Sequence, residues 1–230
     1  SDQQISEYNK NAVYFVRNLV GQMNFEPGQC IISGNIGPRR DGYLADSIMT
    51  ADESKCYHQQ QIQDFAFADV DMVTAITLTN SDEAIGIVEA ASFFGVPVVI
   101  SFTVETDGNL PNGEGLFDAI EKVDQATARY ASHFMINCAQ PDHFKSVLKK
   151  GGNSIGRLQG IRANASCKSH EELDACDSLD AGDKHQLAQD YRELAALLPQ
   201  LKVIGGCCGT DHTHIEMICE ELQFSLISTT

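Results

Sequence analysis

The pattern of apolar and polar residues along the chain predicts strands and helices in alternation. Short apolar runs with few polar interruptions are typical of strands buried on both faces of a sheet. Longer stretches with apolar residues at three- and four-residue steps are typical of amphipathic helices. The short runs predict strands at residues 30–33, 70–77, 97–102, 133–137, 158–163 and 201–204. The periodic stretches predict helices near residues 51–67, 81–94, 114–130, 142–150, 183–198 and 212–222.

One further helix is predicted at the N-terminal end, before any strand. Its apolar residues share one face and are Ile5, Tyr8, Ala12, Phe15, Val16 and Leu19. A leading helix followed by six strand–helix units indicates a parallel sheet covered by helices. Both a doubly wound sheet and a (β/α)₈ barrel fit this order. A barrel needs two more strands and usually about 250 residues, so in a barrel the absent strands belong at the N-terminus.

Composition and charge narrow the class of protein. Hydrophobic residues make up 43% of the 230 residues, which is enough for a sizeable core. The net charge of −16 argues against a nucleic-acid partner, because phosphate binding needs clustered Lys and Arg. No apolar run approaches the roughly 18 residues of a membrane span, and the first residues do not resemble a signal peptide. We therefore expect a cytoplasmic protein whose 8 cysteines are free, metal-bound or catalytic rather than disulfide-bonded.

Two adjacent cysteines stand where the last predicted strand ends. Residues 205–210 read Gly-Gly-Cys-Cys-Gly-Thr, after the strand at 201–204 and before the helix that begins near His212. The carboxyl ends of parallel strands are where α/β proteins place their sites. Cys207 and Cys208 can share one metal only if the strand pleat has ended, and the flanking glycines permit this. Adjacent cysteines can also be small buried residues, so spacing alone leaves both interpretations open.

A zinc site requires a third thiolate from elsewhere in the chain. Tetrahedral zinc takes four ligands, and a catalytic site keeps one position for water or substrate. Cys138 directly follows the predicted strand at 133–137, and a helix-start signal, Gln140-Pro141-Asp142, comes behind it. Because parallel strand ends converge on one face, Cys138 can meet Cys207 and Cys208. We therefore expect these three cysteines to hold Zn²⁺.

Several short motifs together resemble the zinc-dependent homocysteine S-methyltransferase family. Gly-Gly-Cys-Cys-Gly-Thr after a strand is close to diagnostic of that family, and Asn137-Cys138 resembles its Ile-Asn-Cys motif. Residues 35–38 resemble its Ser-Ile-Gly-Pro loop, with Asn35 in the place of Ser, and Tyr43 matches a tyrosine that follows. Asn164 matches the asparagine of a Pro-Asn segment. The resemblance covers essentially the whole chain.

The resemblance implies one domain over residues 1–230, a (β/α)₈ TIM-type barrel that lacks the first two strands in this chain. It implies substrate-binding roles for Asn35, Thr77, Asn137 and Asn164, and metal-binding roles for the three cysteines. An open barrel exposes unpaired edges and core. We therefore expect the chain alone to be poorly soluble or to pair its edge with another chain, for example in a homo-oligomer.

The function that the resemblance implies is zinc-dependent methyl transfer, in enzyme class EC 2.1.1. Homocysteine or a similar thiol would accept the methyl group, giving methionine. S-methylmethionine, S-adenosylmethionine or betaine would donate it, and no nucleic acid or membrane would take part. Relatives have a glutamate that binds the substrate amino group where this chain has Ile76. Two alternatives therefore stay open, namely a relative that uses another thiol acceptor and a non-catalytic zinc-binding protein.

Overall fold

The strands of the protein form one parallel sheet whose spatial order follows the order of the chain. The computed structural model describes residues 2–23, 25–26, 28–45 and 48–227. Its strands are β1 (Ser33–Ile36), β2 (Met72–Leu78), β3 (Val98–Phe102), β4 (His133–Asn137), β5 (Leu158–Ala163) and β6 (Val203–Gly206). Its helices are α1 (Asp2–Gln22), α2 (Ala51–Phe67), α3 (Ser81–Phe94), α4 (Leu116–Ala126), α5 (Pro141–Lys150), α6 (His170–Asp174), α7 (Lys184–Leu197) and α8 (His212–Ile227), with one 3₁₀ turn at Ile155–Arg157.

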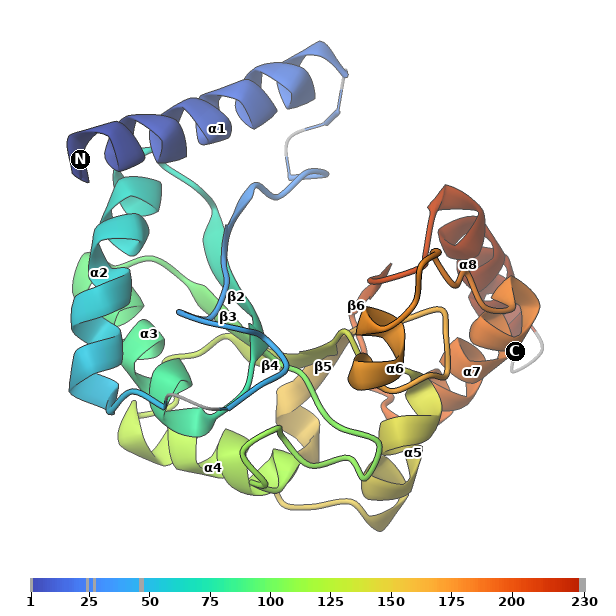
Figure 1. Cartoon of the computed structure of the whole chain (residues 1–230). Coiled ribbons are helices and arrows are strands. Elements are labelled where there is room, and N and C mark those ends of the chain that lie inside the picture. Colours follow the sequence, from blue (N-terminus) through green and yellow to red (C-terminus); the bar gives the residue numbers. More distant parts are fainter. Residues whose placement is uncertain (1, 24, 27, 46–47, 228–230) are drawn as a thin grey trace.

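This strand order decides between the two architectures that the sequence allows. Neighbouring strands are paired in the order β1-β2-β3-β4-β5-β6, and every pairing is parallel. A doubly wound sheet reverses its order at a switch point, and no reversal occurs here. The sheet curls, and helices α2, α3, α4, α5, α7 and α8 lie on its outer side (Figure 1). The fold is thus a partial TIM-type barrel of six strands, as predicted. In the described residues β1 and β6 each pair on one side only.

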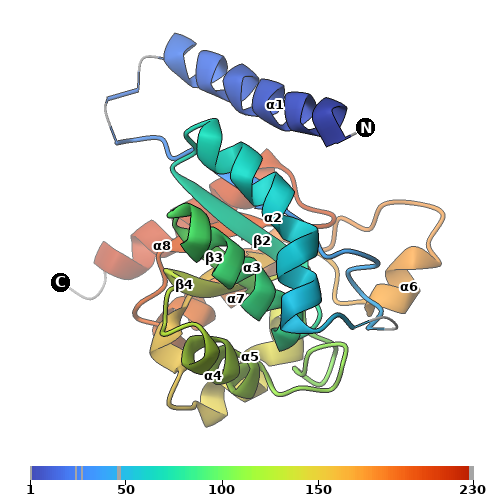
Figure 2. The same cartoon turned by 90° about the vertical axis from the view of Figure 1, so that its left-hand side faces the viewer.

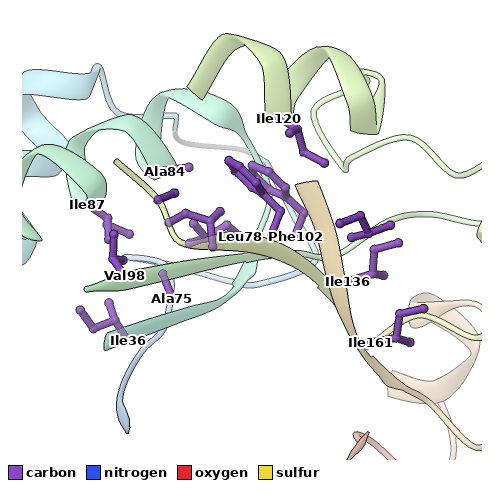
Figure 3. Close-up of a cluster of buried hydrophobic side chains, with 14 of the residues drawn as sticks. Ile36, Ala75, Leu78, Ala84, Ile87, Val98, Phe102, Ile120, Ile136 and Ile161 are labelled. Atoms are coloured by element: carbon purple, nitrogen blue, oxygen red, sulfur yellow. The ribbon is translucent and has the colours of Figure 1, made fainter. Parts of the chain in front are cut away.

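The outer face of the sheet carries the hydrophobic core. All five residues of β3 are buried, and the neighbouring strands place aliphatic side chains against α3 and α4 (Figure 3). Labelled members of this core are Ile36, Ala75, Leu78, Val98, Phe102, Ile136 and Ile161 from the sheet side, with Ala84, Ile87 and Ile120 from the helices. Strands covered in this way need apolar residues in long runs, which is why the sequence pattern predicts them.

The inner face of the same strands carries most of their polar side chains. Side chains alternate along a strand, so the neighbours of the core residues point inward. Asn35 lies opposite Thr74, and Asn137 lies opposite Arg162, which places these four residues on the inner face. Ser101 belongs to the same face, because its hydroxyl donates a 2.6 Å hydrogen bond to Asn137 Oδ1. Polar side chains on the inner face, close to the carboxyl ends of the strands, are typical of a binding site and not of a closed hydrophobic core.

Two strands and one helix differ most from the sequence prediction. The first strand begins at Ser33 rather than at residue 30, because β1 pairs from Ser33 onward with β2. Gly34 belongs to this strand, where it pairs with Val73, and a side chain is excluded there because a Cβ would lie 2.5 Å from the Phe65 ring of α2. The last strand spans Val203–Gly206, two residues later than predicted. Helix α6 was not predicted at all.

Helix α1 is loosely attached to the rest of the molecule. It crosses over α2 (Figure 2), and the side chains of Ser6 and Asn9 both donate hydrogen bonds to Asp64. The apolar face predicted for this helix is mostly exposed, with Tyr8 at 75% and Phe15 at 68% of their full accessibility. No helix within the described ranges is long and apolar enough to cross a membrane.

Candidate metal centre

The structure brings together the three cysteines that the sequence singles out. Cys138 follows β4, while Cys207 and Cys208 follow β6, so all three lie at carboxyl ends of strands. Their Sγ atoms lie within 4.8 Å of one another. Residues separated by 69 positions in the chain therefore present sulfur atoms to one point in space.

Strand β5 lies between the two cysteine-bearing strands and holds both by backbone hydrogen bonds. The N–H of Cys138 donates to the carbonyl of Arg162 at 3.1 Å, and the N–H of Cys207 donates to the carbonyl of Ala163 at 2.8 Å. Both bonds lie just beyond the regular ladder, at the end of the sheet. The end of β5 therefore sets the separation between the cysteines on its two sides.

Asn164 continues this link with its side chain. Its Nδ2 donates to the carbonyl of Cys138 at 3.0 Å, and its Oδ1 accepts from the N–H of Cys208 at 3.1 Å. The side chain is buried, with the residue 2% exposed. Asn164 thus bridges the two halves of the cysteine cluster, which gives it a clear positioning role. The substrate contact expected of Asn164 stays a prediction.

Asn137 and Thr77 fix the backbone beside Cys138. Asn137 Oδ1 accepts from the Thr77 N–H at 2.8 Å, and Asn137 Nδ2 donates to Thr77 Oγ1 at 2.7 Å. Thr77 and Cys138 have positive φ angles of 58° and 55°, which are unfavourable for residues other than glycine. Backbone strain of this kind persists only where surrounding contacts enforce it, and it gathers at functional sites. Substrate-binding roles for Asn137 and Thr77 stay predictions.

Asn35, the last residue predicted to contact substrate, and Ile76, at the position of the family's glutamate, lie on the first two strands. Asn35 is exposed on β1, and no hydrogen bond joins it to the cysteines in the described part of the chain. Ile76 is half-buried on β2, directly before Thr77. The structure therefore leaves the predicted role of Asn35 open, and it places an aliphatic side chain where the resemblance led us to look for a carboxylate.

His170 belongs to the site, although the sequence interpretation missed it. Its Nε2 donates to the carbonyl of Cys138 at 2.6 Å, and its ring centroid is 4.1 Å from that of Tyr43. His170 is the first residue of α6, which begins with a capping box formed by Ser169 and Glu172. The Ser-x-x-Glu spacing is a recognised helix-start signal, so this short helix was open to detection from the sequence.

Tyr43 covers the exposed side of the cluster. Its hydroxyl lies 3.9 Å from Cys208 Sγ. Burial, and then the neighbouring Cys208, raise the pKa of Tyr43 above its usual value, so the phenol stays protonated at neutral pH and its O–H can donate toward the sulfur. A cavity of about 180 Å³ opens beside them, lined by Tyr43, His170, Leu173, Asp174, Ser178, Leu179, Asp180, Cys208 and Gly209.

The sulfur atoms of Cys138 and Cys207 lie next to each other, and the Cα atoms of the two residues are 5.4 Å apart. The strand ends therefore bring both sulfurs to one point beside Cys208. A ligating cysteine must be a thiolate, so the predicted metal site requires these thiols to be reduced.

In the reduced state the same residues fit zinc. Thiolate sulfur is a preferred zinc ligand, and three protein ligands with an open fourth position are the pattern of catalytic zinc sites. Cys138, Cys207 and Cys208 supply that number of sulfurs within 4.8 Å. Within the described residues, the fold and this cluster define an α/β barrel-type protein with three clustered cysteines, suited to hold a metal ion, at the carboxyl ends of its strands.

Comparison with known proteins identifies the family. The sequence profile of the family described as homocysteine S-methyltransferase matches residues 1–222. The chain therefore belongs to the homocysteine S-methyltransferase family, as its motifs predicted.

Two plant relatives carry the name homocysteine S-methyltransferase 1. The protein from Brassica oleracea var. italica is 26% identical over 210 residues, which cover 85% of this chain and 62% of the relative. The protein from Arabidopsis thaliana is 25% identical over 194 residues, which cover 81% of this chain and 56% of the relative. The chain thus spans about three fifths of the length of these relatives.

Solved structures of the homocysteine methyltransferase MmuM from Escherichia coli share the fold. The apo form superimposes with a TM-score of 0.73 at 18% identity, covering 96% of this chain and 76% of MmuM. The metallated form gives 0.73 at 17% identity, with 95% and 71% covered. The oxidized form gives 0.72 at 19% identity, with 96% and 72% covered. At this level of identity the likeness shows the shared barrel architecture.

Proposed function

We propose that this chain, when reduced and loaded with zinc, transfers a methyl group from a sulfonium or quaternary ammonium donor to the thiol of homocysteine, giving methionine. The observation that carries the proposal is the convergence of three cysteine sulfurs within 4.8 Å at the strand ends. Membership of the homocysteine S-methyltransferase family supports the reaction. The existence of a metallated form of MmuM, which has the same fold, supports the metal.

Cys138, Cys207 and Cys208 would hold the zinc ion. A free thiol has a pKa near 8.5 and is mostly protonated at neutral pH, whereas only its thiolate is a good nucleophile. Zinc bound at such a site acts as a Lewis acid that favours the thiolate form of a sulfur ligand. The three cysteines would leave one zinc position for the acceptor, because catalytic zinc sites hold three protein ligands.

The other residues of the site position the reactants. Asn137 and Asn164 fix the backbone of the cysteine loops by the hydrogen bonds described above. Tyr43 limits access to Cys208 from one side. Asp174 and Asp180 place carboxylates in the lining of the adjacent cavity. Asp180 is paired with Lys168 Nζ at 3.1 Å, so Asp174 is the carboxylate left to give the cavity its negative charge. A cavity of this charge favours a cationic donor, and holding sulfur and methyl group together supplies much of the rate acceleration.

The test is methionine formation by the reduced, zinc-loaded protein. Homocysteine is supplied with S-methylmethionine, S-adenosylmethionine or betaine, and methionine is measured by mass spectrometry. The Cys208→Ala variant is expected to lose zinc and activity together, because it lacks one of three ligands. Cys56→Ala is the matched control, since Cys56 is an exposed cysteine of α2 outside the cluster.

Two results would contradict the proposal. If Cys208→Ala keeps a full equivalent of zinc, the three-thiolate site is wrong. If the wild-type protein holds zinc but forms no methionine with any of the donors, the non-catalytic alternative is favoured. Because a ligating cysteine must be a thiolate, activity is expected only with reductant present, which fits the reducing cytoplasm that the sequence predicts.

A further inference from the structure

The six described strands contain a single Lys, Arg, Asp or Glu side chain, and it is Arg162 on β5. Its neighbours Ile161 and Ala163 are 0% and 1% exposed and face the core. Because side chains alternate along a strand, Arg162 points to the inner face. A lone charge on the inner wall of a barrel calls for an explanation, since charged groups avoid partial burial unless they have a partner.

Arg162 stands directly beside both cysteine-bearing strands. It lies opposite Asn137 on β4 and opposite Gly205 on β6, and neighbouring strands are about 5 Å apart. Its carbonyl accepts the hydrogen bond from the N–H of Cys138 at 3.1 Å. Its aliphatic stem lies over Gly205, because a Cβ added at Gly205 would be 3.2 Å from Arg162 Cγ. The side chain thus extends across the inner face next to the metal centre.

The guanidinium of Arg162 has no partner within the described residues. No carboxylate lies within 4.0 Å, and none of its side-chain nitrogens donates a hydrogen bond there, although the chain has 32 acidic residues. Arg157, which lies just before the same strand, shows the usual alternative, because its Nε donates to Asp124 Oδ2 at 2.7 Å. Arg162 is half-buried, so solvent still reaches it and a ligand can do so as well.

We propose that Arg162 binds the carboxylate of the methyl acceptor, so that the acceptors of this protein are thiol carboxylic acids recognised by their acid end. The inference rests on the proposed function. A guanidinium offers a planar fork of donors that matches a carboxylate and binds it through two hydrogen bonds. The six strands offer no carboxylate of their own to an ammonium group. The inner wall therefore discriminates in favour of an anionic group beside the thiol.

The experiment compares three thiols by isothermal titration into the reduced, zinc-loaded protein. Homocysteine has both end groups, 4-mercaptobutanoate lacks the amino group, and 3-mercaptopropylamine lacks the carboxylate. We expect 4-mercaptobutanoate to bind within a few-fold of homocysteine, and 3-mercaptopropylamine to bind at least about 10-fold more weakly. Arg162→Gln is expected to weaken both carboxylate-bearing thiols by about 10–100-fold and to leave 3-mercaptopropylamine unchanged. Arg162→Lys should recover part of the loss.

Arg129→Gln is the matched control, because Arg129 lies outside the site with 67% of its side chain exposed. Zinc content and the midpoint of urea unfolding verify that each variant is folded and metal-loaded. If Arg162→Gln binds 4-mercaptobutanoate as tightly as the wild type, or if 3-mercaptopropylamine binds as well as 4-mercaptobutanoate, the inference is wrong while the proposed function stands. The protein could also prefer carboxylate-bearing thiols through Arg162 and yet transfer no methyl group from any donor. That result would support the inference and contradict the proposed function. Absence of binding by all three thiols overturns both.

Discussion

The two halves of the cysteine cluster stand on different parts of the sheet. Cys138 follows an interior strand, β4, and is 5% exposed. Cys207 and Cys208 follow β6, which pairs on one side only in the described structure and whose four residues are all half-buried. Cys208 itself is exposed. Cys138 is therefore embedded in the core, whereas Cys207 and Cys208 lie at the edge of the described sheet.

This difference indicates that the fold fixes one predicted ligand more firmly than the other two. Cys138 is held by β3 and β5 on either side and by the side chain of Asn137, whether or not a metal is present. The pair on β6 depends on the end of β5 and on Asn164 for its placement. A metal ion that binds all three sulfurs would link the loop after β6 to the buried end of β4. Its binding would therefore stabilise mainly β6 and the loop that follows it.

The largest expected effect is on stability, and it separates the two strands. Ile136→Ala on β4 removes a fully buried side chain, so the free energy of unfolding should fall by about 2–5 kcal/mol. Ile204→Ala makes the same chemical change on β6, where the side chain is half-buried and packs at the edge of the core, and should cost about 1 kcal/mol. Urea unfolding of the reduced, metal-free protein measures both values. Equal losses would mean that β6 is as firmly embedded as β4.

The next effect concerns the link between the two halves. Asn164→Ala removes both hydrogen bonds that join the Cys138 and Cys208 loops. Loss of such a supporting residue should weaken zinc binding by about 10–100-fold, because the sulfurs are less well placed before the metal arrives. Competition with a coloured chelator measures the affinity. Asn153→Ala changes an exposed asparagine outside the site and should leave the affinity as it is. An unchanged affinity in Asn164→Ala would show that β5 backbone bonds alone place the cysteines.

The smallest expected effect is a pH dependence that arises at the start of β4. Burial, and then the positive charges of Arg157 and Lys202, lower the pKa of His133 below 6.5. The unfolded chain therefore binds a proton at His133 at a higher pH than the folded chain does, so stability falls as the pH drops below about 6.5. Unfolding measured from about pH 7.5 to 5.5 should show a shallower fall for His133→Gln than for the wild type.

His185→Gln provides the comparison for that titration. His185 is exposed on α7, so this variant shows the effect of exchanging a histidine for glutamine outside the core. If the slope of stability against pH is the same for His133→Gln as for the wild type, burial at the start of β4 does not control proton binding by His133.

The interior strands β2 to β5 were predictable from the sequence, and the edge strands β1 and β6 were less so. Most residues of strands β2 to β5 are buried, so these strands form largely apolar runs with recognisable ends. The position of Cys138 at a strand end follows from such a run. The bounds of β1 and β6 shifted because glycines occupy strand positions there. Gly34 is required by the close approach of Phe65, which is a tertiary contact that no local pattern reveals.

The support of the site was also hidden from local patterns. Asn164 and His170 both reach the carbonyl of Cys138, and these contacts depend on how β4 and β5 are paired. The close approach of the Cys138 and Cys207 sulfurs results from the same convergence of strand ends. Residue type and motif predicted which cysteines come together, whereas the residues that hold them in place required the structure.

The most direct test of the central claim is X-ray absorption at the zinc edge of the reduced protein loaded with one equivalent of zinc. If Cys138, Cys207 and Cys208 are the ligands, the spectrum will show three sulfur neighbours at about 2.3 Å and one lighter neighbour from solvent. Addition of homocysteine should replace the lighter neighbour by a fourth sulfur at about the same distance. A spectrum with two sulfur neighbours or fewer in the reduced protein would contradict the account.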